Sequence, residues 1–318
     1  MRAHRIASLL RAGSTIVGSL LIGISFCAAP IAAAAASPMQ RASVEPGVEL
    51  EYWILGTGEP VILLHGGLFA DWFQPLLAEP ALTARYRVVS LHRVGYAGSS
   101  RVAGPVSIAR QAAQVRALMQ RLGIERAHIV GHSSGGNIAL QLALDAPQQV
   151  HSLALLEAAL PVGAPAGGAP PARQAAMAAM MDSWRNGDKA GAVDGFMRMV
   201  SGPAYRAAFE RALPGAFERG VADAETFFGQ ELPAVSQWQL AREDAGRITQ
   251  PALAVIGAKS LEVSPIWSAR QQLLMTSLPK AESFVLPDAT HLLHVQNPRA
   301  MAQALADFFA RHPITSGR

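Results

Sequence analysis

The stretch that decides the fold is AHIVGHSSGG, residues 127–136, and an apolar helical pattern follows it as far as Ala146. A β-branched run that ends in G-x-S-x-G and enters a helix is typical of a strand-turn-helix elbow that presents a nucleophilic serine. Gly131 and Gly135 have no Cβ atom, so the strand and the helix can approach closely around Ser133. The free N–H groups at the start of the helix favour negative charge there. We therefore expect Ser133 to act as the nucleophile of an acyl-transfer reaction.

The N-terminal residues have the features of a secretory signal peptide, which we place at residues 1–36. Arg2, Arg5 and Arg11 precede an apolar segment, and small alanines stand before Ser37. The apolar run is short for a bilayer span, although a permanent anchor is the alternative. Removal of this segment leaves 24 basic against 23 acidic residues, a net charge of +1 rather than +4. The expected location is therefore exported, periplasmic or secreted, with no stable membrane anchor after signal cleavage.

Composition narrows the classes of function. The chain has 318 residues, of which 50% are hydrophobic, so it can bury a large core. The nearly neutral mature charge gives no reason to expect nucleic acid as a partner. Cys27, the single cysteine, lies in the predicted signal peptide, which leaves the exported chain without disulfides. The sequence contains no Cys/His metal motif and no phosphate-binding glycine loop, so we expect neither a metal nor a cofactor.

Apolar runs outline a sheet. Residues 48–55 alternate in polarity, as in an early strand. Largely apolar runs are typical of strands buried on both faces of a parallel sheet, and they occupy residues 61–64, 87–91, 150–156, 252–256 and 283–286. Helical patterns separate them, for example at residues 108–122 after the N-cap candidate Ser107. These features predict an α/β fold with a mostly parallel sheet flanked by helices, preceded by a flexible leader at residues 37–47.

The composition changes over residues 161–249. A Gly/Ala/Pro linker at residues 163–171 precedes four short helical patterns, at residues 174–184, 189–199, 205–213 and 224–228. Such an insertion after the sixth strand predicts a helical cap over the site, with residues 48–160 and 250–318 as the core domain. Trp184 of the cap is a candidate for the wall of an apolar substrate pocket, as are Trp72 and Phe73 of the core.

Four stretches together resemble the α/β-hydrolase superfamily, in its branch of serine esterases and lipases. They are LHGG at residues 64–67, RVGYAGS at residues 93–99, GHSSG at residues 131–135 and ATH at residues 289–291. The resemblance implies the α/β-hydrolase fold, with an oxyanion hole formed by the backbone N–H groups of Gly67 and Ser134. We expect His65 to hold the oxyanion loop by hydrogen bonding rather than to take part in catalysis.

The same resemblance implies that His291, on the loop after the last strand, is the general base. Its imidazole would take the proton of Ser133 during the attack and then return it to the leaving group. His294 is the competing histidine. Because it stands three residues further along, near the final helix, we favour a packing or capping role for it.

The acid of the triad departs from the commonest pattern. Proteins that resemble this chain usually carry an aspartate three residues after the glycine that ends the seventh strand, and that position is Ser260. Glu262 lies on the same loop, whereas Glu157 ends the sixth strand, where certain haloalkane dehalogenases place their acid. A glutamate at the end of a buried strand is costly unless it is paired, and His291 can be its partner. We favour Glu157, with Glu262 as the alternative acid.

These residues predict an exported, cofactor-free serine hydrolase of the esterase type that acts on a small apolar ester or related acyl substrate. C–C bond hydrolysis, lactone hydrolysis and perhydrolysis use the same residues and stay open. Dehalogenation and epoxide opening in related families require a nucleophilic aspartate, and Ser133 argues against both. A different class of function is a catalytically silent hydrolase fold that binds a small apolar ligand or a partner, and Ser260 at the usual acid position is the one feature that favours it. Oligomeric state is not specified by the sequence.

Overall fold

The computed structural model of the chain describes residues 38–162 and 170–315. The expected signal peptide at residues 1–36 and most of the linker at residues 163–171 lie outside the described residues, so export stays a prediction. Within the described residues, no helix is long and apolar enough to cross a membrane.

Eight strands form a single sheet in the order β1-β2-β4-β3-β5-β6-β7-β8. Strand β2 pairs antiparallel with β1 and with β4, and every other neighbouring pair is parallel. The predicted mostly parallel α/β sheet is therefore confirmed. The strands are β1 Gln40–Glu45, β2 Val48–Leu55, β3 Glu59–Leu64, β4 Tyr86–Leu91, β5 Ala127–His132, β6 Val150–Leu156, β7 Ala252–Gly257 and β8 Ala281–Leu286.

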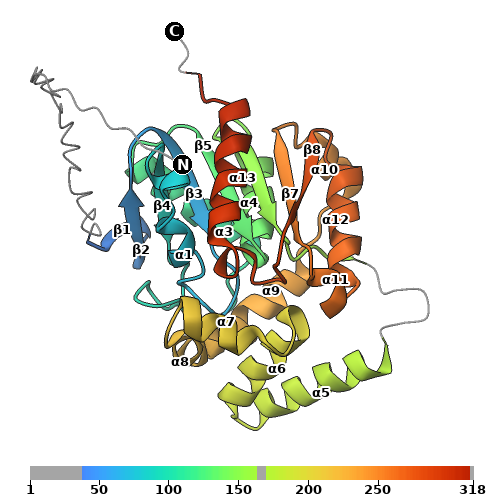
Figure 1. The fold of residues 1–318 in the computed structure, drawn as a ribbon. Helices are drawn as coiled ribbons and strands as arrows, with labels where there is room; N and C mark the ends of the chain where they lie inside the picture. The colour runs from blue at the N-terminus through green and yellow to red at the C-terminus, as the bar shows by residue number, and fades with distance from the viewer. Residues whose placement is uncertain (1–37, 163–169, 316–318) are drawn as a thin grey trace, which may run out of the picture. The chain divides into compact units, whose positions relative to one another are not determined.

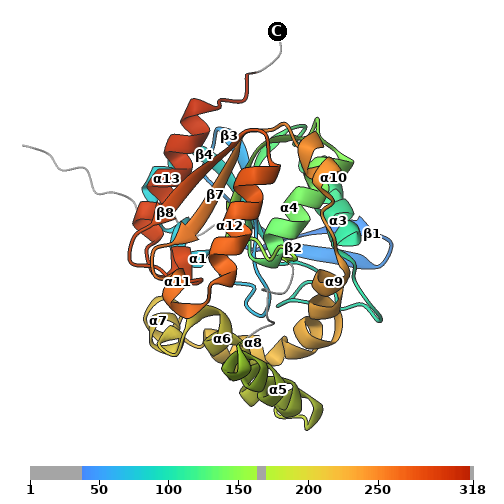
Figure 2. The same ribbon diagram turned by 90° about the vertical axis from the view of Figure 1, so that its right-hand side faces the viewer.

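Helices cover both faces of the sheet because the buried strands are apolar on both sides (Figures 1 and 2). Ile62 and Leu64 of β3 pack with α3 (Ile108–Arg121), α4 (Ser134–Asp145), α10 (Arg242–Arg247) and α12 (Ile266–Ser277). The alternate residues Val61 and Leu63 pack on the other face with α1 (Gln74–Leu77), α2 (Pro80–Thr83) and α13 (Pro298–Arg311). Ser107 caps α3 as expected, since its side chain accepts a hydrogen bond from the Arg110 N–H.

The helical cap predicted after the sixth strand is confirmed. Its helices α6 (Lys189–Ser201), α7 (Tyr205–Ala212) and α8 (Ala216–Ala222) gather at one end of the sheet (Figure 1), and their apolar side chains share a cluster with the loop after β3. The later part of the insertion returns along the core, because Trp238 and Ala245 pack in the main core cluster. The inserted helices are α5 Pro171–Arg185, α6 Lys189–Ser201, α7 Tyr205–Ala212, α8 Ala216–Ala222, the π-helix η1 Glu225–Glu231, α9 Leu232–Gln237 and α10.

The prediction of a flexible leader at residues 37–47 is wrong, because most of that segment is the edge strand β1. It pairs antiparallel with β2, with a shift of register between Ser43 and Glu45, and Arg41 forms an ion pair with Glu51 across the two strands at 2.8 Å. Ala42 and Val44 are partly buried against the core. The strand was missed because a polar edge strand carries too few apolar residues to produce a clear alternation.

The turn between β5 and α4 has the geometry expected of a nucleophile elbow. Ser133 has φ 51° and ψ −121°, a conformation that L residues rarely adopt. A Cβ atom added at Gly131 would lie 2.4 Å from the Gly135 carbonyl oxygen, and one added at Gly135 would lie 2.1 Å from the Leu64 carbonyl oxygen. The backbones of β3, β5 and α4 therefore meet without room for side chains.

The Gly135→Ala variant is expected to lose about 3 kcal/mol or more of stability, because the backbone of β3 cannot yield to the new methyl group. Thermal unfolding followed by circular dichroism should show a Tm lower by roughly 6 °C or more, or no soluble protein. Gly246→Ala is the matched control, since that position lies in α10 with open space around it. The control should be unchanged or slightly stabilised. Equal Tm values for the two variants would contradict the packing argument.

Candidate active site

Ser133 is fixed by backbone hydrogen bonds to the strand beside it. Its N–H donates to the Leu156 carbonyl at the end of β6 at 3.0 Å, and its carbonyl accepts from the N–H groups of Gly136 at 2.9 Å and Ala159 at 3.0 Å. The side chain is half-buried. These bonds hold the serine at the carboxyl ends of the parallel strands, which is where ligands bind in open α/β sheets.

His291 and Glu157 come together at the same edge of the sheet. The His291 Nδ1 lies 2.7 Å from the Glu157 Oε2, and both residues are 3% exposed. The other carboxylate oxygen, Oε1, accepts the Gly257 N–H at 2.9 Å. The His291 ring is also stacked on Trp267, with ring centroids 4.0 Å apart. A proton on Nδ1 directed at the carboxylate leaves Nε2 as the basic nitrogen, which is the tautomer that a general base needs.

The two other candidate positions for the acid lie on the short helix α11 (Ser260–Val263). Glu262 is exposed, whereas Ser260 is fully buried. The Ser260 hydroxyl lies close enough to Glu157 to lower its pKa. Ser260, at the position where an aspartate is usual, therefore lies beside the carboxylate of Glu157, which directly follows β6. The structure brings Glu157 rather than Glu262 to His291.

Burial dominates the protonation of this pair. It raises the pKa of Glu157 to about 7, against the opposing effects of the Ser260 hydroxyl, the Gly257 N–H and the charge of Arg270. Burial, followed by the charge of Arg270, lowers the pKa of His291 well below its usual value. At neutral pH the imidazole is therefore neutral and able to accept a proton. Two groups this close titrate as a pair rather than separately.

Gly67 and Ser134 are the candidate oxyanion donors. Ser134 is the first residue of α4, so its N–H has no partner inside the helix. The Gly67 carbonyl accepts from the Phe69 N–H at 2.9 Å and from Trp72 Nε1 at 3.0 Å. His65 holds the loop as expected. Its Nε2 accepts the Arg93 N–H at 2.9 Å, which leaves the proton on Nδ1, 2.6 Å from the Gly66 carbonyl oxygen.

The aromatic pocket candidates have different positions. Trp72 is buried beside the elbow, with its ring 4.5 Å from that of His132. Trp184 is stacked on Phe228 at 5.0 Å in the cap cluster. The prediction that Phe73 lines the substrate pocket is wrong. Its side chain packs in the core cluster on the face of the sheet that α1, α2 and α13 cover, and its ring is stacked on His294 with centroids 4.4 Å apart. Trp72 and Phe73 belong to different apolar clusters although both rings lie near His294, and composition alone does not distinguish them.

Two further histidines lie next to this site. His294, in the 3-10 helix η2 (Leu293–Val295), is fully buried against Phe73, which agrees with the packing role favoured for it. His132, the residue before the elbow serine, was not singled out in the sequence. Its Nε2 lies 3.0 Å from the His291 carbonyl oxygen, so it ties the loop of His291 to the end of β5. The sequence feature that could have identified His132 is its position as the first variable residue of G-x-S-x-G, next to Ser133.

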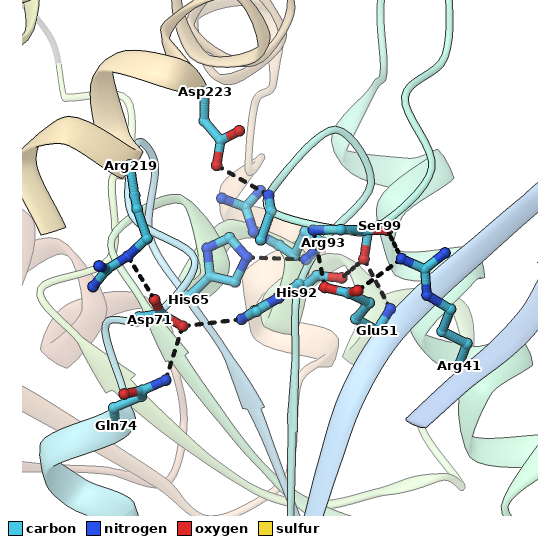
Figure 3. Close-up of polar contacts among 12 residues, drawn as sticks. Arg41, Glu51, His65, Asp71, Gln74, His92, Arg93, Ser99, Arg219 and Asp223 are labelled. Carbon is cyan, nitrogen blue, oxygen red and sulfur yellow. Dashed lines mark hydrogen bonds and ion pairs between the residues drawn. The ribbon is translucent and has the colours of Figure 1, made fainter. Parts of the chain in front are cut away.

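Charged side chains join the cap to the core beside the oxyanion loop. Arg219 of α8 forms an ion pair with Asp71 at 3.0 Å, and Asp71 also lies 3.2 Å from Nε2 of His92 (Figure 3). Asp223 accepts the Ala97 N–H at 3.0 Å. Figure 3 shows Arg219 reaching down to Asp71, which also contacts His92, whereas Asp223 reaches the segment that contains Arg93. Sequence analysis identified none of these contacts, since the partners lie far apart in the chain.

The fold and the elbow agree with the comparison to known families. Residues 59–298 match the family described as alpha/beta hydrolase fold. The chain belongs to this family and is an α/β hydrolase.

Individual relatives match different shares of the chain. A dihydrolipoyllysine-residue acetyltransferase component of the acetoin cleaving system from Cupriavidus necator is 42% identical over 130 residues, 41% of this chain and 33% of that protein. The protein with that name from Pseudomonas putida is 30% identical over 80% of this chain and 64% of its own length. This chain thus spans between a third and two thirds of these relatives. The solved structure of Est816, titled an N-acyl homoserine lactone degrading enzyme, has a TM-score of 0.65 and 26% identity, covering 85% of this chain and 100% of that one.

The hydrogen bond between His291 and Glu157 should be visible by proton NMR. A proton shared between an imidazole Nδ1 and an ionised carboxylate is strongly deshielded, because the hydrogen bond is charge-assisted. We expect one far-downfield imidazole N–H resonance above neutral pH, lost in Glu157→Gln and retained in the control Glu262→Gln. A resonance that persists in Glu157→Gln would show that another group holds His291.

Proposed function

We propose that this α/β hydrolase is a serine hydrolase that cleaves carboxylic esters through Ser133, His291 and Glu157. The observation that carries the proposal is the buried contact of 2.7 Å between His291 Nδ1 and Glu157 Oε2, at the sheet edge where the strained Ser133 turn ends β5. The carboxylate is itself fixed by the Gly257 N–H. A serine, a histidine and an oriented carboxylate are the parts that acyl transfer requires.

In the first half of the reaction, the Ser133 Oγ attacks the ester carbonyl carbon while its proton passes to Nε2 of His291. The carbonyl oxygen becomes an oxyanion, for which Gly67 and Ser134 supply backbone N–H donors. Ionised Glu157 stabilises the imidazolium that forms. When the tetrahedral intermediate collapses, the C–O bond to the alcohol breaks, and His291 returns the proton to the leaving alkoxide.

In the second half, a water molecule attacks the acyl-serine ester. His291 takes one proton from that water and later donates it to the Ser133 oxygen, which releases the carboxylic acid. Burial suits His291 for both transfers, because its lowered pKa keeps the imidazole neutral before each attack. The apolar side chains of Trp72 and of the cap favour a small apolar acyl group.

Lactones are a second candidate substrate class. A lactone is a cyclic ester and is opened by the same attack, with the alcohol remaining on the acyl product. The likeness to Est816, which spans 85% of this chain and all of that one, supports this candidate. The ligand-binding alternative loses its main support, since Ser260 at the usual acid position is accompanied by Glu157 beside His291.

The Ser133→Ala variant is expected to lose at least about 10³-fold in the hydrolysis of a short-chain p-nitrophenyl ester. The assay uses the chain from residue 37 onward, together with an N-acyl homoserine lactone as the second substrate. A fluorophosphonate should label the wild type and not the variant. Ser236→Ala, an exposed serine of α9, is the control and should match the wild type. Undiminished hydrolysis by Ser133→Ala would exclude this serine as the nucleophile.

The pH profile should report the Glu157–His291 pair. Because burial raises the pKa of Glu157 to about 7, the carboxyl gains a proton as the pH falls through about 7 and can no longer stabilise an imidazolium. We expect kcat/KM for a neutral ester to rise with pH through about 7 and then level off. In Glu157→Gln the plateau should fall by about 10²–10⁴-fold. The pH range over which kcat/KM rises should also move to lower pH in this variant, since only His291, with its lowered pKa, then titrates. If kcat/KM in Glu157→Gln rises over the same pH range as in the wild type, the pH dependence does not come from Glu157.

A further inference from the structure

A buried ion pair joins the cap to the loop after β4, which packs against the oxyanion loop. Arg93, on the loop after β4, places Nη2 2.9 Å and 3.0 Å from the two carboxylate oxygens of Glu231, the last residue of η1. Both side chains are 2% exposed. The Tyr96 hydroxyl donates to the same carboxylate, and burial raises the pKa of Tyr96 well above its usual value, so it remains a neutral donor. A buried charge of either sign needs such a partner, because desolvation costs several kcal/mol per ion.

The guanidinium of Arg93 also contacts both elements that supply the candidate oxyanion donors. Its Nη2 donates to the Gly66 carbonyl at 3.0 Å and lies 3.4 Å from the Ser134 Oγ. Its Nη1 donates to Gln111 Oε1 at 2.7 Å, which ties the group to α3. The backbone N–H of Arg93 donates to His65, and the two residues lie side by side in Figure 3. One side chain thus bridges the β3 loop, the start of α4 and the cap.

The contact with Gly66 fixes the direction of the Gly67 N–H. Both groups belong to one peptide unit, which is planar and trans, so the carbonyl and the N–H point in opposite directions. The Gly66 carbonyl oxygen is held by Arg93 Nη2 at 3.0 Å and lies 2.6 Å from His65 Nδ1. Because neither residue has a Cβ atom to restrict rotation of this peptide, these two bonds help to set its plane.

Glu231 lies close enough to the oxyanion loop to affect it directly. A Cβ atom at Gly67 would lie 3.4 Å from the Glu231 Oε1 and 2.3 Å from the ring of Phe227, one turn earlier in η1. A carboxylate here opposes negative charge on a nearby substrate oxygen unless a cation balances it. Arg93 is that cation. The π-helix therefore places both an apolar ring and a balanced charge on the outer side of the loop.

We propose that Arg93 is a positioning residue of the oxyanion hole and that Glu231 of the cap holds it in place, so that the hole is complete only when the cap is docked. This inference rests on the proposed function, because it needs an oxyanion to form at Gly67 and Ser134. Arg93 does not touch the substrate. It aims the Gly67 N–H through the Gly66 carbonyl.

The test compares Arg93→Lys and Glu231→Gln with the wild type. Lysine keeps the charge, but its single ammonium cannot contact Gly66 and Glu231 as Nη2 does while also holding Gln111 as Nη1 does. Glutamine keeps the shape of Glu231 and removes its charge. We expect each variant to lower kcat for the p-nitrophenyl ester by roughly 10–100-fold, less than the loss of a whole donor, with KM within about 3-fold. Affinity for a trifluoromethyl ketone, which forms a tetrahedral adduct with the serine, should fall in proportion to kcat/KM.

The double variant, Arg93→Lys with Glu231→Gln, should have a kcat no lower than that of the less active single variant, because both substitutions act through the same peptide. Asp223→Asn is the matched control. Asp223 is also a buried carboxylate of the cap, paired with Arg101 at 2.6 Å, and it contacts the same core loop without reaching Gly66. The control should keep kcat within about 2-fold. A similar loss of kcat in Asp223→Asn would mean that Arg93 and Glu231 contribute only by holding the cap on the core, and it would overturn the proposal.

Two other results would overturn it. A higher kcat or tighter ketone binding in Glu231→Gln would mean that Glu231 acts only as an opposing charge. Equal kcat in all variants would mean that Arg93 does not aim the donor. Fluorophosphonate titration counts the folded active sites of each variant, so kcat is compared per competent site. Failure of the proposed function is recognised separately, because the wild type would then be unlabelled and Ser133→Ala would keep its activity.

Discussion

Backbone-to-backbone packing at the end of β5 is the constraint on which the rest of the site depends. Gly135 leaves no room for a Cβ atom beside the Leu64 carbonyl, so α4 begins directly against the end of β3. That approach brings the oxyanion loop, which follows β3, next to the N-terminus of α4. It also forces Ser133 into its positive φ, which turns the side chain out of the sheet edge. The strained turn at Ser133 therefore lies where the proposed nucleophile and both candidate oxyanion donors come together.

Two buried carboxylates serve this site in different ways. Glu157 shares a proton with a neutral histidine, and burial raises its pKa to about 7, so its charge can respond to pH and to chemistry at Ser133. Glu231 faces the guanidinium of Arg93, which balances its charge. Breaking a buried pair costs about 3–5 kcal/mol, a large fraction of the stability of a domain. Each pair holds a side chain beside the candidate active site, since Glu157 contacts His291 and Glu231 contacts Arg93.

Much of the fold could be predicted from the sequence because it depends on local patterns. The buried parallel strands are apolar on both faces, and the elbow is contiguous in the chain. Glu157 was favoured because a glutamate ending a buried strand needs a partner, and the structure brings it to His291. Residues that act through distant pairing were not predictable in this way. Arg93 and Glu231 are 138 positions apart, and Glu231 ends a π-helix whose register has no clear sequence signal. The polar edge strand β1 was missed for the related reason that its pairing with β2, not its own pattern, makes it a strand.

The position of the acid follows from the register of the sheet rather than from a particular loop. Strands β6 and β7 are parallel neighbours with Leu156 opposite Val255, so the residues that follow them reach the same edge. The Glu157 N–H donates to the Val255 carbonyl at 3.0 Å, and the Gly257 N–H donates back to the Glu157 side chain at 2.9 Å. A carboxylate from either strand end can therefore meet a histidine that arrives after β8. Because Ser260 is small and buried beside Glu157, the β7 loop leaves space for the carboxylate and adds a hydroxyl that favours its ionised form. The histidine does not have to move when the acid changes strand, and for this reason the fold tolerates either arrangement.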